Sequence, residues 1–324
     1  MKVSVIIPTY NAASTLRRAI DSVTSQSLQD LEIIAVDDGS SDDTFAILEE
    51  LAAGDPRVRP IRLPRNGGSY AARNRAIEES RGEWIFVLDA DDWYAPGRLE
   101  RMVDVAERHG ADMVADDQFL YDATLDRVID RALLPFANGA TERPLDTCEY
   151  LQNTITGVMR FDYGLLKPGI RRAFLLEQKL RYDDAYRNGA DFGFYLDILM
   201  AGGRVWLLQE AMYYYTQPVG TVSHRPSRTE RLRYDYAGMR AMTDRLLARH
   251  AQRLKAEEAE LLARRSRSIT AYGRYLELRE EMRQRQFGQA VGLSLQHREV
   301  LPFVLRAVGR SISARMTPKR GAAA

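Results

Sequence analysis

The stretch WIFVLDADD at residues 84–92 decides how this chain folds, because a short apolar run passes directly into three acids. Residues 84–88 are aromatic or branched and predict a buried β-strand. Asp89, Asp91 and Asp92 follow immediately behind this strand. Acids gathered behind an apolar strand indicate a binding or catalytic site rather than a solvated loop.

Strand-like and helix-like segments alternate on either side of this stretch. We expect strands at 3–8, 31–36, 58–63, 84–88 and 112–115, and helices between them at 12–26, 42–53, 69–80 and 98–109. This alternation predicts an α/β fold with a mostly parallel sheet and helices on both faces. Farther on we expect a helix at 190–200, short strands at 204–208 and 211–216, and a helical pattern beyond about residue 229.

Acids occur at the ends of two predicted strands, Asp37 and Asp38 after the second and Asp89 and Asp91 after the fourth. The carboxyl ends of parallel strands meet at one edge of a sheet, where ligands bind. We therefore expect these carboxylates to lie close together, and their repulsion requires a compensating cation. Oxygen ligands favour Mg²⁺ or Mn²⁺ over zinc. The alternative for Asp37 and Asp38 is an ordinary loop or helix cap.

Four ordered motifs in roughly the first hundred residues resemble the family 2 glycosyltransferases, which have the Rossmann-like GT-A fold. The motifs are VSVIIPTYN at 3–11, VDDGSSD at 36–42, NGG at 66–68 with AARN at 71–74, and LDADDW at 88–93. Chain length and a basic tail also resemble bacterial exopolysaccharide glycosyltransferases of the succinoglycan type. The resemblance implies a nucleotide-sugar-binding and catalytic domain over 1–216. A basic, mainly helical region over 217–324 follows, with a disordered tail from about 316.

The resemblance assigns the residues that hold the donor nucleotide one by one. Pro8 and Tyr10 match the loop beside the nucleoside. Asp38 matches the acid that hydrogen-bonds the base, usually uracil. Arg73 stands where the family often has a basic residue near the nucleotide. These four positions imply a nucleotide diphosphate-sugar donor, with UDP-hexoses favoured by the family likeness alone.

Asp89 and Asp91 match the Asp-x-Asp motif of the same family. The resemblance implies that Asp91 binds an Mn²⁺ or Mg²⁺ ion, and that Asp89 contacts either the ribose or the same ion. A metal here would act as a Lewis acid and neutralise the charge that develops on the departing nucleoside diphosphate.

On the acceptor side, Asp191 and Phe192 match a segment in which the family usually has Glu-Asp followed by an aromatic residue. That Asp is the family's general base, which takes the proton of the acceptor hydroxyl. A single displacement with one base inverts the anomeric centre, and the acceptor would be a saccharide or a lipid-linked saccharide. This chain departs from the pattern because Ala190 replaces the Glu. An acid at the start of the helix 190–200 is also favoured by the helix dipole alone.

Other functions are weighed against sugar transfer. A Rossmann dehydrogenase is disfavoured because residues 8–12 read PTYNA rather than a glycine-rich phosphate loop. A non-catalytic nucleotide-sugar-binding or scaffold protein stays open, since Ala190 removes a carboxylate. A sugar nucleotidyltransferase would require inorganic pyrophosphate as its product. No nucleic-acid partner is expected, because no nucleic-acid-binding module is recognisable.

Charge is spread unevenly along the chain. The formal net charge is +1, but residues 231–324 contain 20 Lys and Arg against nine Asp and Glu. Residues 301–316 combine an apolar stripe with arginines, namely Leu301, Phe303, Val304, Leu305, Val308 and Ile312 with Arg306, Arg310 and Arg315. Such a segment suits an anionic membrane surface. Packing on the catalytic domain or on another subunit is the alternative.

The chain carries no recognisable export signal. Its N-terminal sequence lacks the basic start, apolar core and cleavage site of a secretion signal. No run of about 18 apolar residues predicts a membrane-spanning helix. A single cysteine, Cys148, allows no intrachain disulfide, as in a reducing compartment. We therefore expect a cytoplasmic protein that can lie at the inner face of the cell membrane.

Overall fold

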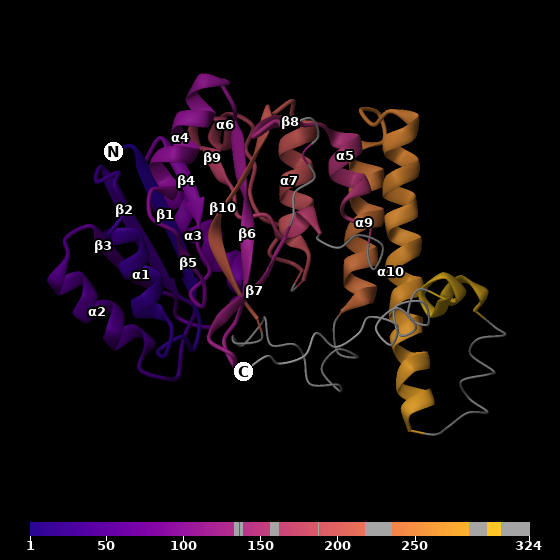
Figure 1. Ribbon diagram of the computed structural model, residues 1–324, viewed down its shortest axis with the longest axis horizontal. Coiled ribbons are helices and arrows are strands. Elements are labelled where there is room, and N and C mark those ends of the chain that lie inside the picture. Colours follow the sequence, from indigo (N-terminus) through magenta and orange to yellow (C-terminus); the bar gives the residue numbers. More distant parts are fainter. Residues whose placement is uncertain are drawn as a thin grey trace, which may run out of the picture.

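The computed structural model describes residues 1–132, 136, 139–155, 162–186, 188–217, 235–284 and 297–305. Their strands form one sheet with helices on both faces (Figure 1), which confirms the predicted α/β class. The strands are β1 Val3–Thr9, β2 Leu31–Asp37, β3 Val58–Arg62, β4 Trp84–Val87, β5 Trp93–Tyr94, β6 Met113–Asp122, β7 Arg127–Arg131, β8 Glu142–Leu145, β9 Gly169–Arg171 and β10 Val205–Gln217.

The sheet is parallel in its first part and mixed beyond it. Its order is β3-β2-β1-β4-β9-β6-β10-β5, with β7 paired to β6 and β8 paired to β10. Strands β1, β2, β3 and β4 pair in parallel, as do β6 and β10. Strand β9 lies between β4 and β6 and runs antiparallel to both. Because β9 is reversed, its amino end lies beside the carboxyl end of β4.

Helices cover the two faces of the sheet. One face packs against α1 Leu16–Thr24, α2 Thr44–Gly54 and α4 Arg98–Arg108. The other face packs against α3 Ser69–Glu79, α5 Thr147–Gln152, α6 Arg172–Glu177 and α7 Ala190–Met200. The remaining elements are the short 3-10 helices η1 Tyr163–Leu165 and η2 Arg298–Val300, and the helices α9 Tyr236–His250 and α10 Ala256–Arg283.

Strand β1 shows why the central strands read as continuous apolar runs. All of its residues are buried, and successive side chains point to opposite faces. Val5 and Ile7 belong to the apolar cluster on the α1 side, whereas Ile6 belongs to the cluster on the α3 side. A strand with helices above and below it has no polar face, so its sequence does not alternate.

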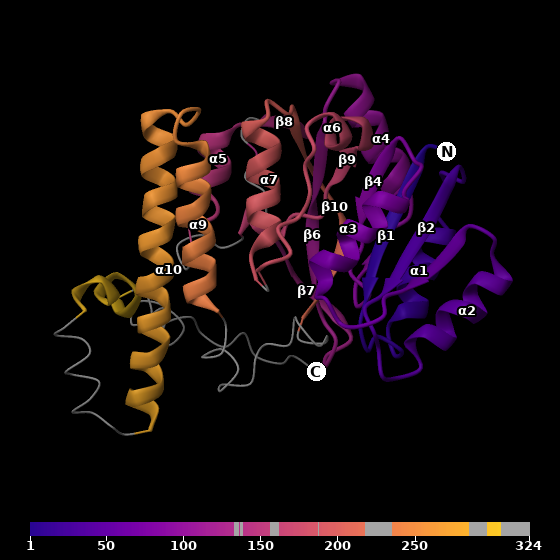
Figure 2. The same cartoon turned by 180° about the vertical axis from the view of Figure 1, so that it is seen from behind.

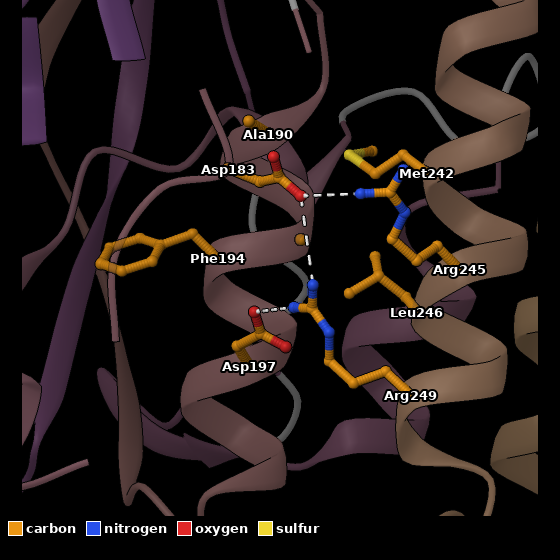
Figure 3. A pocket seen from close by; sticks show the side chains of 9 residues that line it. Asp183, Ala190, Phe194, Asp197, Met242, Arg245, Leu246 and Arg249 are labelled. Atoms are coloured by element: carbon orange, nitrogen blue, oxygen red, sulfur yellow. Dashed lines mark hydrogen bonds and ion pairs between the residues drawn. The ribbon is translucent and has the colours of Figure 1, made fainter. Parts of the chain in front are cut away.

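The C-terminal helices α9 and α10 lie side by side beyond α7 and α5 (Figures 1 and 2). Met242 and Leu246 of α9 belong to the same apolar cluster as the strands. A Cβ atom at Gly193 of α7 would lie 3.4 Å from Leu246 Cδ1, so the two helices approach closely there. Figure 3 shows the adjoining polar contact, in which Arg249 donates to Asp197 at 2.9 Å. Helix α9 therefore holds α7 in place, and a domain boundary near residue 216 stays a prediction.

Two strand predictions differ from the structure. The strands predicted at 204–208 and 211–216 are one strand, β10, with irregular register after Leu208 and after Ala211. The strand predicted at 112–115 continues to Asp122. The sequence did not predict this continuation, because the middle of the strand is polar. Asp116 and Asp117 are buried there and form ion pairs with Arg98 and Arg131.

Part of the predicted apolar stripe at 301–316 is described. Phe303 is buried against Tyr275 of α10, whereas Leu301 and Leu305 are exposed. Val308, Ile312 and the arginines of the stripe lie outside the described residues, as does the tail from about 316. Among the helices that the structure describes, none is long and apolar enough to cross a bilayer.

Candidate active site

The candidate site lies at the edge of the sheet where β1, β2 and β4 end. The turns after β1 and β2 are joined there, because the Ser41 amide donates to Asn11 Oδ1 at 2.9 Å. Asn11 has φ of 47°, a left-handed conformation that Asn tolerates better than most residues. The two residues predicted to flank the nucleoside lie in this region. Pro8 is buried within β1, and Tyr10 is exposed just beyond its end.

Asp38 fixes the loop that leads into α3. Its buried carboxylate accepts hydrogen bonds from the Gly67 amide at 2.7 Å and from the Gly68 amide at 2.8 Å. Gly68 has φ of 91°, which favours glycine, and it precedes the first residue of α3. Each carboxylate oxygen retains further acceptor capacity. The hydrogen bond to a nucleotide base stays a prediction for Asp38, beside this structural role.

Arg73 of α3 joins the two acids that the sequence assigned to opposite sides of the reaction. One guanidinium nitrogen donates to Asp89 Oδ1 at 2.6 Å, and the other makes a short contact with Asp191 Oδ1. The side chain is buried. Burial alone would lower the pKa of Arg73, but the charges of Asp191 and Asp89 hold it well above its ordinary value. The structure thus brings together three predicted residues that are far apart in the sequence.

Asp89 is held by two cations of the protein itself. Besides Arg73, the Lys167 ammonium donates to Asp89 Oδ2 at 2.5 Å. Burial by itself would raise the pKa of Asp89, but the charges of Lys167 and Arg73 outweigh it and hold that pKa below its usual range. Both carboxylate oxygens of Asp89 are therefore engaged by positive charges.

Asp91 has a different environment. The pKa of its carboxyl is raised to about 7, first by burial and then by the negative charge of Asp89. Arg18 and Thr216 donate to the Asp91 backbone carbonyl, at 3.2 Å and 2.6 Å. In the described part of the chain, no side chain donates to its carboxylate. The charges of Lys167 and Arg18 lower this pKa only in part, and among the described residues neither cation forms an ion pair with the Asp91 carboxyl.

Asp92 ties the acidic loop to β10. Tyr213 donates to Asp92 Oδ2 at 2.6 Å, and the Thr216 amide donates to Oδ1 at 2.7 Å. The Tyr213 hydroxyl also accepts the Asp89 amide at 3.2 Å. Burial, followed by the charges of Asp91 and Asp89, raises the pKa of Asp92 well above its ordinary value. Asp92 therefore supports the loop rather than facing a ligand.

Asp191 lies in the first turn of α7, behind Gly189. Tyr70 donates to Asp191 Oδ2 at 3.3 Å, so α3 supplies both of its described side-chain partners, Tyr70 and Arg73. The neighbouring Phe192 is buried, and the Arg265 guanidinium lies 3.6 Å from its ring centroid. Ala190 lines a small hollow (Figure 3) that has both apolar and charged walls, the latter formed by Asp183, Asp197, Arg245 and Arg249.

The acids fit a divalent cation at one position. Mg²⁺ is commonly bound by one or two carboxylates together with substrate phosphates and water. Asp91 fits this role because, among the described residues, its carboxyl forms no ion pair, and the charges of Lys167 and Arg18 do not offset burial and the charge of Asp89. Asp89 fits it less well, because Arg73 and Lys167 hold both of its oxygens. Among the described residues there is no group of three His, Cys, Asp or Glu side chains suited to a metal. A cation here would draw its other ligands from a bound diphosphate and water.

The site thus combines acids behind a central strand with an acid on a separate helix, and Arg73 contacts both. Sequence comparison identifies the particular family. Residues 4–174 match the model described as Glycosyl transferase family 2, and the chain belongs to that family. The family prediction and the enzyme class are thereby confirmed.

Two relatives align with nearly the whole chain. The succinoglycan biosynthesis protein ExoO of Rhizobium meliloti is 34% identical over 97% of this chain and 86% of its own length. The succinoglycan biosynthesis protein ExoU of the same organism is 32% identical over 98% of this chain and 89% of its own length.

Solved structures confirm the GT-A fold. S. aureus TarS, residues 1–349, superposes with a TM-score of 0.64 at 21% identity, covering 92% of this chain and 81% of TarS. The same protein in complex with UDP-GlcNAc superposes with a TM-score of 0.61 at 19% identity, covering 92% of each chain.

The sequence did not indicate Lys167, Tyr70 and Arg18 as site residues. None of the three directly follows a parallel strand in the chain, which is where ligand-binding residues are expected. Lys167 precedes the antiparallel strand β9, Tyr70 lies on α3 and Arg18 on α1. The motif AARN at 71–74 was the one signal near them, since it places the first turns of α3 at the site.

Proposed function

We propose that this protein is an inverting, metal-dependent glycosyltransferase that transfers a hexose from a UDP-sugar to a saccharide or lipid-linked acceptor. The observation that carries the proposal is the Arg73 bridge between Asp89 and Asp191. It joins the donor-side motif to the candidate base in a single site. The alternative, a non-catalytic nucleotide-sugar-binding protein, is an outcome of the test below.

Asp191 is the proposed general base. Its carboxylate takes the proton of the acceptor hydroxyl while the new bond forms at the anomeric carbon. On the opposite side, the bond between the anomeric carbon and the diphosphate oxygen breaks, and the electron pair leaves with the diphosphate. Attack opposite the leaving group inverts the anomeric centre, and Arg73 and Tyr70 orient the base. A divalent cation at Asp91 would neutralise charge on the diphosphate when bound.

The relatives supply the substrate class of the proposal. TarS has been solved with UDP-GlcNAc and with UDP, and it shares the fold. ExoO and ExoU are named for succinoglycan biosynthesis. We therefore propose a UDP-sugar donor and a role in exopolysaccharide synthesis. The roles of Pro8, Tyr10 and Asp38 beside the nucleoside belong to the same proposal.

The test is a panel of donors and acceptors, read as release of nucleoside diphosphate with Mn²⁺ and with EDTA. Asp191→Asn should retain UDP binding and lose transfer by about a hundred- to ten-thousand-fold. Asp91→Ala should lose the metal-dependent activity. Asp184→Asn is the matched control, because Asp184 is an exposed acid paired with Arg181. Full transfer by Asp191→Asn would remove it as the base, and UDP binding by the wild type without release from any pair would favour the non-catalytic alternative.

Membrane association through the C-terminal region is a separate part of the proposal. Leu301 and Leu305 are exposed, while Phe303 packs on α10. The exposed positions lie at the start of the basic apolar stripe and would enter an anionic surface. Co-sedimentation with anionic and neutral vesicles tests this, with Leu301→Glu/Leu305→Glu expected to weaken binding to anionic vesicles. Equal sedimentation with both kinds of vesicle would contradict it.

A further inference from the structure

Lys167 enters the site from the segment before β9, which is not one of the parallel strands of the sheet. It lies two residues before β9, which is antiparallel to β4 and pairs Gly169 with Phe86. The Val87 amide lies 3.5 Å from the Pro168 carbonyl, so the chain before β9 runs beside the end of β4. Lys167 is therefore carried to the same edge as the acids that follow β4.

The backbone carbonyl of Lys167 is held by a buried arginine. Arg98 donates to the Lys167 carbonyl at 2.6 Å and makes two hydrogen bonds to Asp116, at 2.9 Å and 2.7 Å. Both members of this ion pair are fully buried. A bidentate pair of this kind is geometrically specific, so it sets the position from which the lysine side chain departs.

The ammonium of Lys167 is buried in contact with Asp89. The lysine side chain is 5% exposed and the Asp89 side chain 24% exposed. An ammonium has three donors. Among the described residues, Asp89 is the one hydrogen-bond acceptor of this ammonium, and the Tyr215 ring centroid lies 5.7 Å away. Two of its three N–H donors therefore have no hydrogen-bond acceptor among the described residues.

Lys167 is the second cation at Asp89, and its charge also acts to lower the pKa of the neighbouring Asp91 and Asp92. Arg73 already donates to Asp89 at 2.6 Å, and burying a second cation costs free energy unless it is well paired. A lysine ammonium is a compact charge that binds phosphate well. The group that brings new negative charge to this edge in the proposed reaction is the diphosphate of the donor.

We propose that Lys167 binds the diphosphate of the sugar donor and stabilises it as it leaves. This assignment rests on the proposed function and adds a residue to it. In the ligand-free protein the ammonium is held by Asp89. When the donor binds, the unused N–H groups of the ammonium donate to phosphate oxygens, while Asp89 continues to orient it.

Binding measurements separate this role from a structural one. Lys167→Met should lose UDP affinity by about tenfold or more, because hydrogen bonds to charged groups are the strong ones. It should lose less affinity for UMP, which lacks the second phosphate. Lys179→Met is the charge-matched control, because Lys179 is an exposed lysine in the turn after α6, and it should leave both affinities unchanged. Titration calorimetry with Mn²⁺ present gives all four values, and retained UMP binding shows that the variant folds.

A second variant removes the effect that Lys167 exerts through Asp89. If the lysine only neutralises Asp89, then Asp89→Asn/Lys167→Met should bind UDP as well as Asp89→Asn. If it contacts the diphosphate, the double variant should bind about tenfold more weakly than Asp89→Asn. Equal binding by these two variants, or equal losses for UDP and UMP in Lys167→Met, would overturn the assignment. Absence of UDP binding by the wild type would overturn the proposed donor as well, which distinguishes the two failures.

Discussion

Arg73→Met tests whether the contact between the donor motif and the candidate base is a charged one. Methionine retains much of the length of arginine but donates no hydrogen bonds. The substitution removes the contact with Asp89 at 2.6 Å and the contact with Asp191. Asp89 keeps Lys167 as a partner, whereas Asp191 keeps only the Tyr70 hydroxyl at 3.3 Å among the described side chains. The uncompensated charge therefore falls mainly on Asp191.

The expected loss of stability follows from the burial of these groups. Removing one partner of a buried ion pair costs about 3–5 kcal/mol, because the other charge is left in a poorly solvated place. Lys167 relieves part of this cost at Asp89, so we expect the lower end, about 3 kcal/mol. For a chain of 324 residues the entropy of unfolding is about 0.7 kcal/mol/K, so each kcal/mol lowers the melting temperature by roughly 1.5 °C. Arg73→Met should therefore melt roughly 4–5 °C below the wild type.

The neighbouring Arg75 provides a matched control on the same helix. Its side chain is 46% exposed, against 4% for Arg73, and it pairs with Glu79 at 2.6 Å across one helical turn. Exposed pairs of this kind contribute about 0.3–0.5 kcal/mol, so Arg75→Met should melt within about 2 °C of the wild type. Urea unfolding followed by far-UV circular dichroism gives the free energies for both variants.

A double variant identifies the charge responsible. Asp191→Asn in the Arg73→Met background replaces an unpaired carboxylate with a neutral amide. It should recover part of the lost stability, so the two substitutions should not be additive. The reasoning is refuted if Arg73→Met is as stable as Arg75→Met, or if adding Asp191→Asn destabilises Arg73→Met further.

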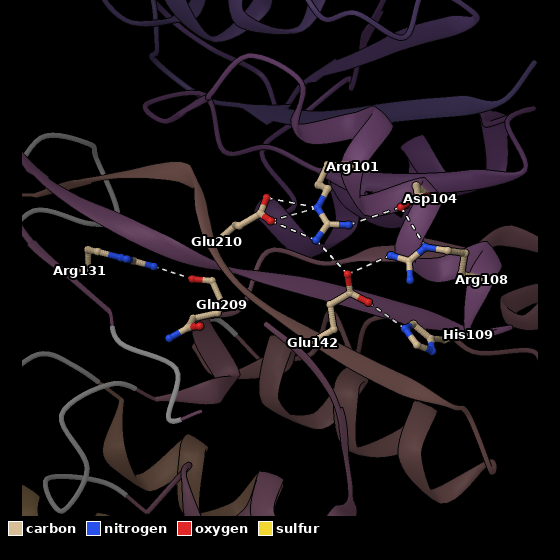
Figure 4. Close-up of polar contacts among 8 residues, drawn as sticks. All are labelled: Arg101, Asp104, Arg108, His109, Arg131, Glu142, Gln209 and Glu210. Atoms are coloured by element: carbon tan, nitrogen blue, oxygen red, sulfur yellow. Dashed lines mark hydrogen bonds and ion pairs between the residues drawn. The ribbon is translucent and has the colours of Figure 1, made fainter. Parts of the chain in front are cut away.

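Three further predictions concern contacts that stabilise the fold. Glu142 accepts a hydrogen bond from Arg108 (Figure 4). This bond, together with those from His109 and Arg101, lowers the pKa of Glu142 to about 2, although burial alone would raise it. Its folded pKa is below the unfolded one, so Glu142→Gln should cost on the order of 1 kcal/mol at neutral pH, and urea midpoints should converge as pH falls from about 4.5 toward 2. Tyr213→Phe should lower stability by about 1–3 kcal/mol in urea, since buried Asp92 loses a donor, and an unchanged midpoint would contradict this. Leu246→Ala should cost about 2–5 kcal/mol and lower transfer at assay temperature, whereas full stability would show that α9 does not hold α7.

Much of the fold could be predicted from the amino-acid sequence alone. The apolar runs that became β1, β2 and β4 are buried on both faces, so their sequences had to be continuous. The acids behind β4 stood out because they follow such a run without a break. Features of this kind are local, and a local pattern can be read without knowing what packs against it.

The irregular second half was harder to predict from the chain. Strand β6 passes through Asp116 and Asp117, which sequence patterns assign to the surface. They are buried because Arg98 and Arg131, distant in the sequence, neutralise them. A buried acid depends on a partner that periodicity does not reveal.

The fold class, the family and the acids at the strand ends follow from local patterns in the amino-acid sequence. Which charges meet depends on how the chain is folded. Arg73 lies between Asp89 and Asp191, Lys167 is a second cation at Asp89, and Asp91 forms no ion pair among the described residues. Electrostatic pairing depends on separation in space and on burial, and segments from four regions of the chain must assemble before either is defined.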